Sequence, residues 1–146
     1  MPRRQTIPRQ WLIALADEGL SAAARLPRGS GVLLLAPLSP RAMRRLRSIA
    51  RLRGLRVASE ECAARVHNTG ELRRALLARK PLVLLSPIHP TRTHPDWEPI
   101  PRMRAAALAR LGRRRLLALG GMNEESYAAV EQLGFIGWAG ISAFRT

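Results

Sequence analysis

The stretch from Leu84 to Pro95 gathers hydroxyl, imidazole and guanidinium groups directly after an apolar run. It reads LLSPIHPTRTHP, and its prolines at positions 87, 90 and 95 exclude both a helix and a central strand. Thr91, Thr93 and His94 are therefore expected on a stiff loop, where hydroxyls can meet an anion and an imidazole can move a proton. A plain turn-rich connection would have the same composition.

Two glycine-bearing turns follow the last two apolar runs of the chain. In LALGGMNEES the adjacent glycines let the backbone approach a ligand, and a helix beginning near Asn123 would direct its N–H groups to that place. In (β/α) barrels a phosphate commonly lodges between the loops after the last two strands, although Gly-Gly alone also serves any tight turn. The predicted phosphate ligands at these two turns are Gly120, Gly121, Gly140, Ile141 and Ser142.

Histidine and carboxylate residues are few. His67, in RVHNTGEL, ends another apolar run and is with His94 a candidate for acid–base catalysis, although a lone histidine is more often a structural hydrogen-bond partner. The chain contains two aspartates, Asp17 and Asp96, and one cysteine, Cys62. No metal ligands are predicted, because zinc and magnesium sites need clustered thiolates, imidazoles or carboxylates.

Short apolar runs alternate with stretches of helical periodicity, the pattern of β/α units around a buried parallel sheet. Helices are expected at Pro40–Leu52, Glu71–Ala78 and Arg102–Leu111, and from Asn123 to Gly134 with both ends encoded by capping residues. Strands are expected at Trp11–Leu15, Gly31–Ala36, Leu55–Ala58, Ala64–His67, Leu82–Ser86, Leu116–Leu119 and Ile136–Ile141. The fold class is therefore α/β, a truncated TIM-barrel-like parallel sheet of about six to seven strands in one domain over residues 1–146.

The net charge of +15 invites a nucleic-acid interpretation, because cationic surfaces release counterions from phosphates. All basic residues except Lys80 are arginines scattered over amphipathic stretches, and aromatic residues make up only 4% of the chain. We therefore expect no specific nucleic-acid partner. No apolar run approaches the roughly 20 residues of a membrane span, so a cytoplasmic protein without a membrane partner is expected.

Four segments together resemble the thiamine phosphate synthase family and its thiazole tautomerase relatives. They are VHNTGEL, SPIHPTRTHP, ALGGMN and GWAGISA, in the family's order and at its strand ends, over roughly residues 64–144. The resemblance implies a TIM barrel that joins hydroxymethylpyrimidine diphosphate to thiazole phosphate and releases diphosphate with the help of Mg²⁺.

The resemblance also implies roles for individual residues. Thr91 and Thr93 correspond to the loop that meets the thiazole phosphate, and Gly121 to a backbone donor to it. His94 stands where many members have a lysine that touches the diphosphate, and His67 corresponds to the strand-end histidine. Ile141 and Ser142 correspond to the last phosphate-binding turn.

The chain departs from this family in its length and in its carboxylates. Such barrels need about 200 residues or more, and this chain has 146. Between Leu55 and Val66 it lacks the segments that carry the family's magnesium ligands, so Mg²⁺ is implied by resemblance while its ligands are not found. An active synthase of thiamine biosynthesis is the first expectation. The alternative is a non-catalytic or tautomerase-like relative that keeps only the thiazole-phosphate site, and exposed sheet edges favour a homo-oligomer.

Overall fold

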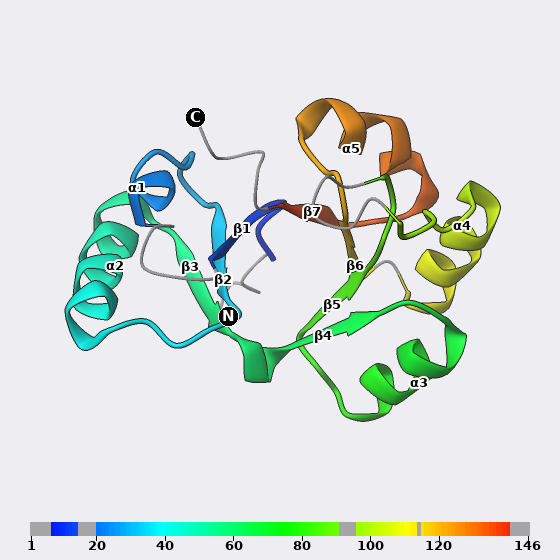
Figure 1. Ribbon diagram of the computed structural model, residues 1–146, viewed down its shortest axis with the longest axis horizontal. Helices are drawn as coiled ribbons and strands as arrows, with labels where there is room; N and C mark the ends of the chain where they lie inside the picture. Colours follow the sequence, from blue (N-terminus) through cyan, green and yellow to red (C-terminus); the bar gives the residue numbers. More distant parts are fainter. Residues whose placement is uncertain (1–6, 15–19, 91–95, 114, 141–146) are drawn as a thin grey trace, which may run out of the picture.

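Figure 1 shows the computed structural model of the 146-residue protein, which describes residues 7–14, 20–90, 96–113 and 115–140. Strands and helices alternate along most of the chain, as the sequence predicted. Their order is β1 (Gln10–Ala14), α1 (Leu20–Ala23), β2 (Gly31–Leu34), α2 (Pro40–Arg53), β3 (Arg56–Ser59), η2 (Glu60–Cys62), β4 (Ala63–Val66), α3 (Thr69–Leu77), β5 (Leu82–Leu85), α4 (Arg102–Leu111), β6 (Leu116–Leu119), α5 (Glu124–Val130), η3 (Glu131–Leu133) and β7 (Gly137–Gly140).

The seven strands form one parallel sheet in the order β3-β2-β1-β7-β6-β5-β4. The sheet curls, with α1 and α2 outside one part of it and α3, α4 and α5 outside the other (Figure 1). This confirms the predicted truncated TIM-barrel-like α/β fold. The first strand of the chain lies in the middle of the sheet, where it pairs with β2 on one side and with β7 on the other.

The two edge strands, β3 and β4, are consecutive in the chain. Only the single turn η2 separates them, whereas a parallel neighbour normally requires a crossover of a dozen or more residues. β3 pairs with β2 and β4 pairs with β5, so the two strands lie at opposite edges of the sheet. So short a connection can join them because the sheet curls and brings its two edges toward each other (Figure 1). The chain thus omits a helix here, which is one reason that 146 residues accommodate seven strands.

Alternate residues of the strands fill the concave side of the sheet with apolar side chains. Trp11 is fully buried there with Leu33, Leu84 and Leu117, and its indole N–H donates to the Pro8 carbonyl oxygen at 2.8 Å. A Cβ at Gly31, on the neighbouring strand, would lie 2.2 Å from a Trp11 ring atom. Gly31 therefore makes room for the indole that fills this interior.

The convex side packs two separate apolar clusters against the helices. One joins β1 and β2 to α1 and α2, and the other joins β4 to β7 to α3, α4 and α5. The predicted caps are confirmed: the Ser39 hydroxyl accepts from the Ala42 N–H at 3.2 Å, and Gly134 ends η3 with a φ of 111°. The four-residue α1 was not predicted, because one turn is too short for a periodic signal.

Tyr127, the only tyrosine, is buried between α5 and the chain that leads into β7. Its hydroxyl donates to the Phe135 carbonyl oxygen at 3.1 Å, and the Arg9 guanidinium carbon lies 5.3 Å from its ring centroid. Burial raises its pKa above 10.0, Glu131 raises it further, and Arg9 opposes both effects. Glu131 and Arg9 also pair with each other at 3.1 Å.

This raised pKa predicts a loss of stability at alkaline pH. Between the unfolded pKa of 10.0 and the higher folded pKa, the native state holds the phenolic proton that the unfolded chain releases. The stabilisation is complete below pH 10 and falls as the pH rises through the folded value. Chemical denaturation of the wild type and Tyr127→Phe from about pH 9 to about pH 11 tests this. The wild type should lose stability relative to the variant, and parallel curves would contradict the prediction.

Candidate functional site at the carboxyl ends of β4 to β7

Strands β4 to β7 are neighbours, and their carboxyl ends bring the described candidate residues together. Val66 pairs with Leu85, Leu85 with Ala118, and Leu119 with Ala139. The residues that follow or end these strands form what we call the carboxyl-end rim: His67, Ser86, Gly120, Gly121 and Gly140.

The remaining predicted site residues lie outside the described part of the chain. These are Thr91, Thr93, His94, Ile141 and Ser142. Their predicted roles stay predictions. Thr91, Thr93 and His94 fall between Pro90 and Asp96, two described residues of the connection between β5 and α4.

His67 is held by Ser86, a residue that the sequence did not single out. Its Nδ1 lies 2.7 Å from the Ser86 carbonyl oxygen and 3.3 Å from the Ser86 Oγ. A carbonyl oxygen only accepts, so Nδ1 carries the proton in this contact and Nε2 of the neutral ring is left as an acceptor. The Trp97 ring stands edge-on to the imidazole at 6.2 Å between centroids. The arrangement suits a histidine that accepts a proton or a hydrogen bond through Nε2.

The tautomer of His67 can be tested directly. We expect Nδ1–H with an unprotonated Nε2 in the neutral ring. Nitrogen-15 NMR of the ring nitrogens, with His67→Gln to assign the signals, reports it. A ring protonated on Nε2 would contradict the contact with the Ser86 carbonyl oxygen.

The residues after His67 explain the spacing of the VHNTGEL motif. The Asn68 Oδ1 accepts from the Glu71 N–H at 2.9 Å, which caps α3. The Glu71 carboxylate in return accepts from the His67 N–H and from the Asn68 side-chain amide, each at 3.1 Å. The cap fixes the backbone of His67 at the start of α3, so this acid three residues after the asparagine has a structural role.

The Gly120–Gly121 turn packs directly on the loop that leaves β5. The Ile88 N–H donates to the Leu119 carbonyl oxygen at 3.0 Å and the His89 N–H to the Gly120 carbonyl oxygen at 3.1 Å. Both glycines have positive φ, and a Cβ at Gly121 would lie 2.7 Å from the Pro90 carbonyl oxygen. The glycines therefore allow two neighbouring strand exits to approach each other closely.

The backbone hydrogen-bonding groups of this turn are only partly used. The Gly121 carbonyl oxygen accepts from the Ser126 Oγ at 3.1 Å, and the Asn123 Oδ1 accepts from the Ser126 N–H at 2.8 Å. Within the described ranges the Gly121 N–H has no acceptor, so it can donate to an anion. Glu124 and Glu125, both exposed in the first turn of α5, oppose an anion at the start of that helix. A phosphate at the rim would therefore depend more on the backbone amides and hydroxyls that precede α5 than on the dipole of that helix.

The described residues do not supply a magnesium site. Among them, no three side chains of the metal-binding types His, Cys, Asp and Glu come together. A diphosphate-binding Mg²⁺ takes oxygen ligands, normally including carboxylates.

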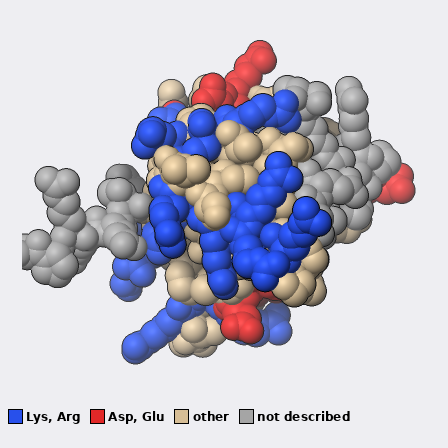
Figure 2. All heavy atoms as spheres, turned by 90° about the vertical axis from the view of Figure 1, so that its left-hand side faces the viewer, with Lys and Arg blue, Asp and Glu red and all other residues tan. Residues whose placement is uncertain are grey.

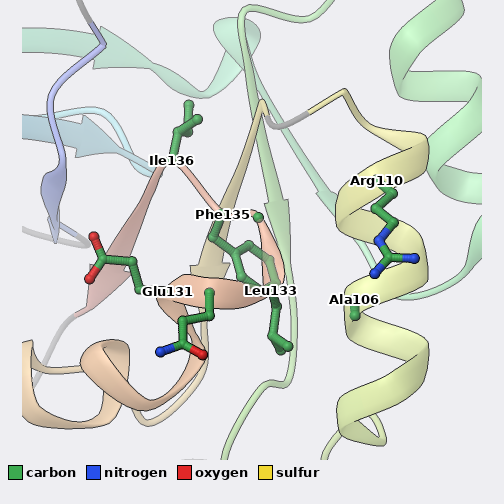
Figure 3. Close-up of a pocket in the computed structure, with 8 residues that line it drawn as sticks. Ala106, Arg110, Glu131, Leu133, Phe135 and Ile136 are labelled. Carbon is green, nitrogen blue, oxygen red and sulfur yellow. The ribbon is translucent and has the colours of Figure 1, made fainter.

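An open pocket of about 490 Å³ lies elsewhere (Figure 3). It is bordered by Ala106 and Arg110 of α4 and by Glu131, Leu133 and Phe135 near η3, at the amino end of β7. None of the rim residues lines it. This pocket is therefore separate from the rim.

Comparison with known proteins gives likeness in fold. No protein-family model matches the sequence, and no curated protein sequence matches it. A thiamine phosphate pyrophosphorylase from Pyrococcus furiosus superposes with a TM-score of 0.73 and 16% identity, over 95% of this chain and 88% of that one. One from Bacteroides thetaiotaomicron gives 0.57 and 13%, over 93% and 83%. A structure described as native KDPGal gives 0.53 and 15%, over 95% and 85%. At such identities the likeness shows the fold alone.

Within the described ranges, none of the helices is long and apolar enough to span a membrane.

Proposed function

We propose that this protein is a cytoplasmic, thiamine phosphate synthase-like enzyme. It would bind a thiazole phosphate at the carboxyl-end rim and join it to hydroxymethylpyrimidine diphosphate. The main support is the side-by-side exit of β5, β6 and β7, with the β5 loop hydrogen-bonded to the Gly120–Gly121 turn. This lies in a fold shared with two structures named thiamine phosphate pyrophosphorylase.

In this proposal each group has a defined task. The Gly121 N–H and the hydroxyls of Thr91, Thr93 and Ser142 donate to the phosphate of the thiazole. The backbone at Gly140 and Ile141 completes the phosphate site. His67 accepts a hydrogen bond or a proton through Nε2, and His94 meets the diphosphate.

The reaction itself is a displacement at the methylene carbon of the pyrimidine. The bond from this carbon to the diphosphate oxygen breaks, its electron pair leaves with the diphosphate, and a bond to the thiazole nitrogen forms. Stabilising the charge of the leaving diphosphate is the main catalytic task in such a step. Arginines of this strongly basic chain could meet part of that charge.

A second candidate function is favoured by one observation. Among the described residues no three metal-binding side chains come together, and the two pairs of adjacent acids, Glu60–Glu61 and Glu124–Glu125, lie on η2 and α5. A relative that binds only the thiazole phosphate, as a tautomerase or without catalysis, would need no such cluster. We therefore keep this narrower function as the alternative.

One set of assays separates the two candidates. The full chain is incubated with both substrates and Mg²⁺, and thiamine phosphate is measured by chromatography. Growth of a synthase-deficient strain that carries the gene is the matching assay in cells. Product together with growth supports the synthase. Neither product nor growth, with saturable calorimetric binding of thiazole phosphate that weakens in Ser142→Ala, supports the alternative. No saturable binding and no product would contradict both.

Homo-oligomer formation is a proposal of its own. The outer edges of β3 and β4 have no strand partner among the described residues, and unpaired parallel edges favour association. Light scattering of the purified chain measures the mass in solution. A monomer at all concentrations would contradict this proposal and leave the enzymatic one unaffected.

A further inference from the structure

Among the described residues, the α1–α2 layer of the molecule contains arginines and no carboxylates, and acidic side chains appear only at the margins of this face (Figure 2). The 40 residues from Leu20 to Ser59 contain nine arginines and no aspartate or glutamate, whereas the described carboxylates all follow Ser59 in the chain. Figure 2 looks onto this side and shows lysine and arginine side chains gathered across it. General enrichment in arginine would raise its count everywhere, but it would not remove the acids from one layer of the fold.

Helix α2 presents the most regular part of this surface. Ala42 and Leu46 face the core, while Arg41, Arg44, Arg45 and Arg51 are exposed on a different face of the helix, with Ser48 between the last two. Arg47 is also exposed and lies to one side of them. We call the four residues Arg41, Arg44, Arg45 and Arg51 the α2 arginine stripe. No described carboxylate forms an ion pair with them. Arg53 is not included, because its Nε and Nη2 donate to the Leu26 carbonyl oxygen at 2.9 and 2.7 Å.

We propose that the α2 arginine stripe binds the phosphate backbone of a DNA duplex without reading its sequence. The ten residue-to-residue steps from Arg41 to Arg51 rise about 15 Å along the helix. One DNA strand presents a phosphate about every 3.4 Å of its axis, so about four phosphates match four arginines. The guanidinium fork pairs with phosphate oxygens in two parallel hydrogen bonds.

Other anionic partners fit this surface less well. The segment from Leu20 to Ser59 contains no aromatic residue on which single-stranded bases could stack. Leu52, 75% exposed, is the only large exposed hydrophobic residue of α2, too little apolar surface to insert into a membrane. An α-helix enters the wide major groove of B-form DNA, whereas the A-form groove of duplex RNA is too narrow.

The test compares two variants that lose the same charge at different places. Arg41→Gln/Arg45→Gln removes half of the α2 arginine stripe. Arg73→Gln/Arg104→Gln removes two exposed arginines from α3 and α4, so the net charge of the two proteins is equal. Fluorescence anisotropy measures binding of a labelled duplex of about 20 base pairs to the full chain at several salt concentrations.

For four phosphate contacts, the logarithm of the association constant should fall against the logarithm of salt with a slope of about −3.5. The α2 variant should make this slope shallower by about 2, and the α3–α4 variant should leave it unchanged. Equal changes in both variants would overturn the proposal, because binding would then follow total charge. Tighter binding to single-stranded DNA, to duplex RNA or to vesicles of anionic lipid would also overturn it, as would absence of saturable binding at low salt.

Discussion

We expect Trp11→Ala to lower the free energy of unfolding by about 3–5 kcal/mol, the range for removing a large buried aromatic side chain. Trp11 is fully buried on the concave side of the sheet, in contact with the apolar cluster that includes Leu33, Leu84 and Leu117. Its removal leaves a cavity bordered by rigid strands, which relax little, and it abolishes the 2.8 Å hydrogen bond to the Pro8 carbonyl oxygen. Denaturation in urea measures the change.

A double-mutant cycle with Gly31→Ala shows whether the loss arises from this packing. A Cβ at Gly31 would lie 2.2 Å from the Trp11 ring, so Gly31→Ala alone should also be destabilising. In the double variant the new methyl group occupies space that the indole has left. The combined loss should therefore be smaller than the sum of the two single losses. Additive losses would contradict the packing that the structure shows.

We expect Gly121→Ala to cost about 2–5 kcal/mol of stability, of which about 1–2 is the cost of a positive φ for alanine. Gly121 has a φ of 61°, and its new Cβ would lie 2.7 Å from the Pro90 carbonyl oxygen and 3.0 Å from the His89 Cβ. The loop that leaves β5 must then move away from the turn that leaves β6. If the rim holds the thiazole phosphate, displacement of the Gly121 N–H as the turn and the loop move apart should weaken its binding about 10- to 100-fold.

Gly54→Ala is a matched control for this substitution. Gly54 ends α2 with a φ of 63°, close to that of Gly121, but a Cβ there meets no atom within 4 Å. The control should lose only about 1–2 kcal/mol and should bind thiazole phosphate like the wild type. Urea denaturation and calorimetry of both variants separate backbone strain from the contact with the loop. Equal losses of stability would show that the loop does not press on Gly121.

The strands could be predicted from the sequence because each is a short apolar run bounded by loop residues. The predicted bounds of all seven strands lie within one or two residues of the observed ends. The caps at Ser39 and Asn123 were also predicted. These are local signals: a hydroxyl or amide that accepts from the first turn of a helix is visible in a few residues. The parallel arrangement followed from the alternation of runs and helices.

Contacts between distant residues were not visible in the sequence. The bond of His67 to Ser86 depends on the pairing of β4 with β5, and it fixes a tautomer that no motif encodes. The Gly120–Gly121 pair was predicted as a phosphate cradle, and the structure shows a further reason for both glycines, the close approach of the β5 loop. The carboxylates of Glu124 and Glu125 favour the start of α5, yet they also repel an anion there.

The η2 turn makes the protein a candidate for division into two reassembling pieces. Every strand pairing lies either within β1 to β3, within β4 to β7, or between β1 and β7. Cleavage of the backbone between Glu60 and Cys62 would therefore break no ladder, and the pieces would be held together by the register of Gln10 with Trp138, Trp11 with Ala139 and Leu12 with Gly140. If two coexpressed halves recombine only when the pairing of β1 with β7 is intact, the divided protein would report proximity between two partners fused to the halves.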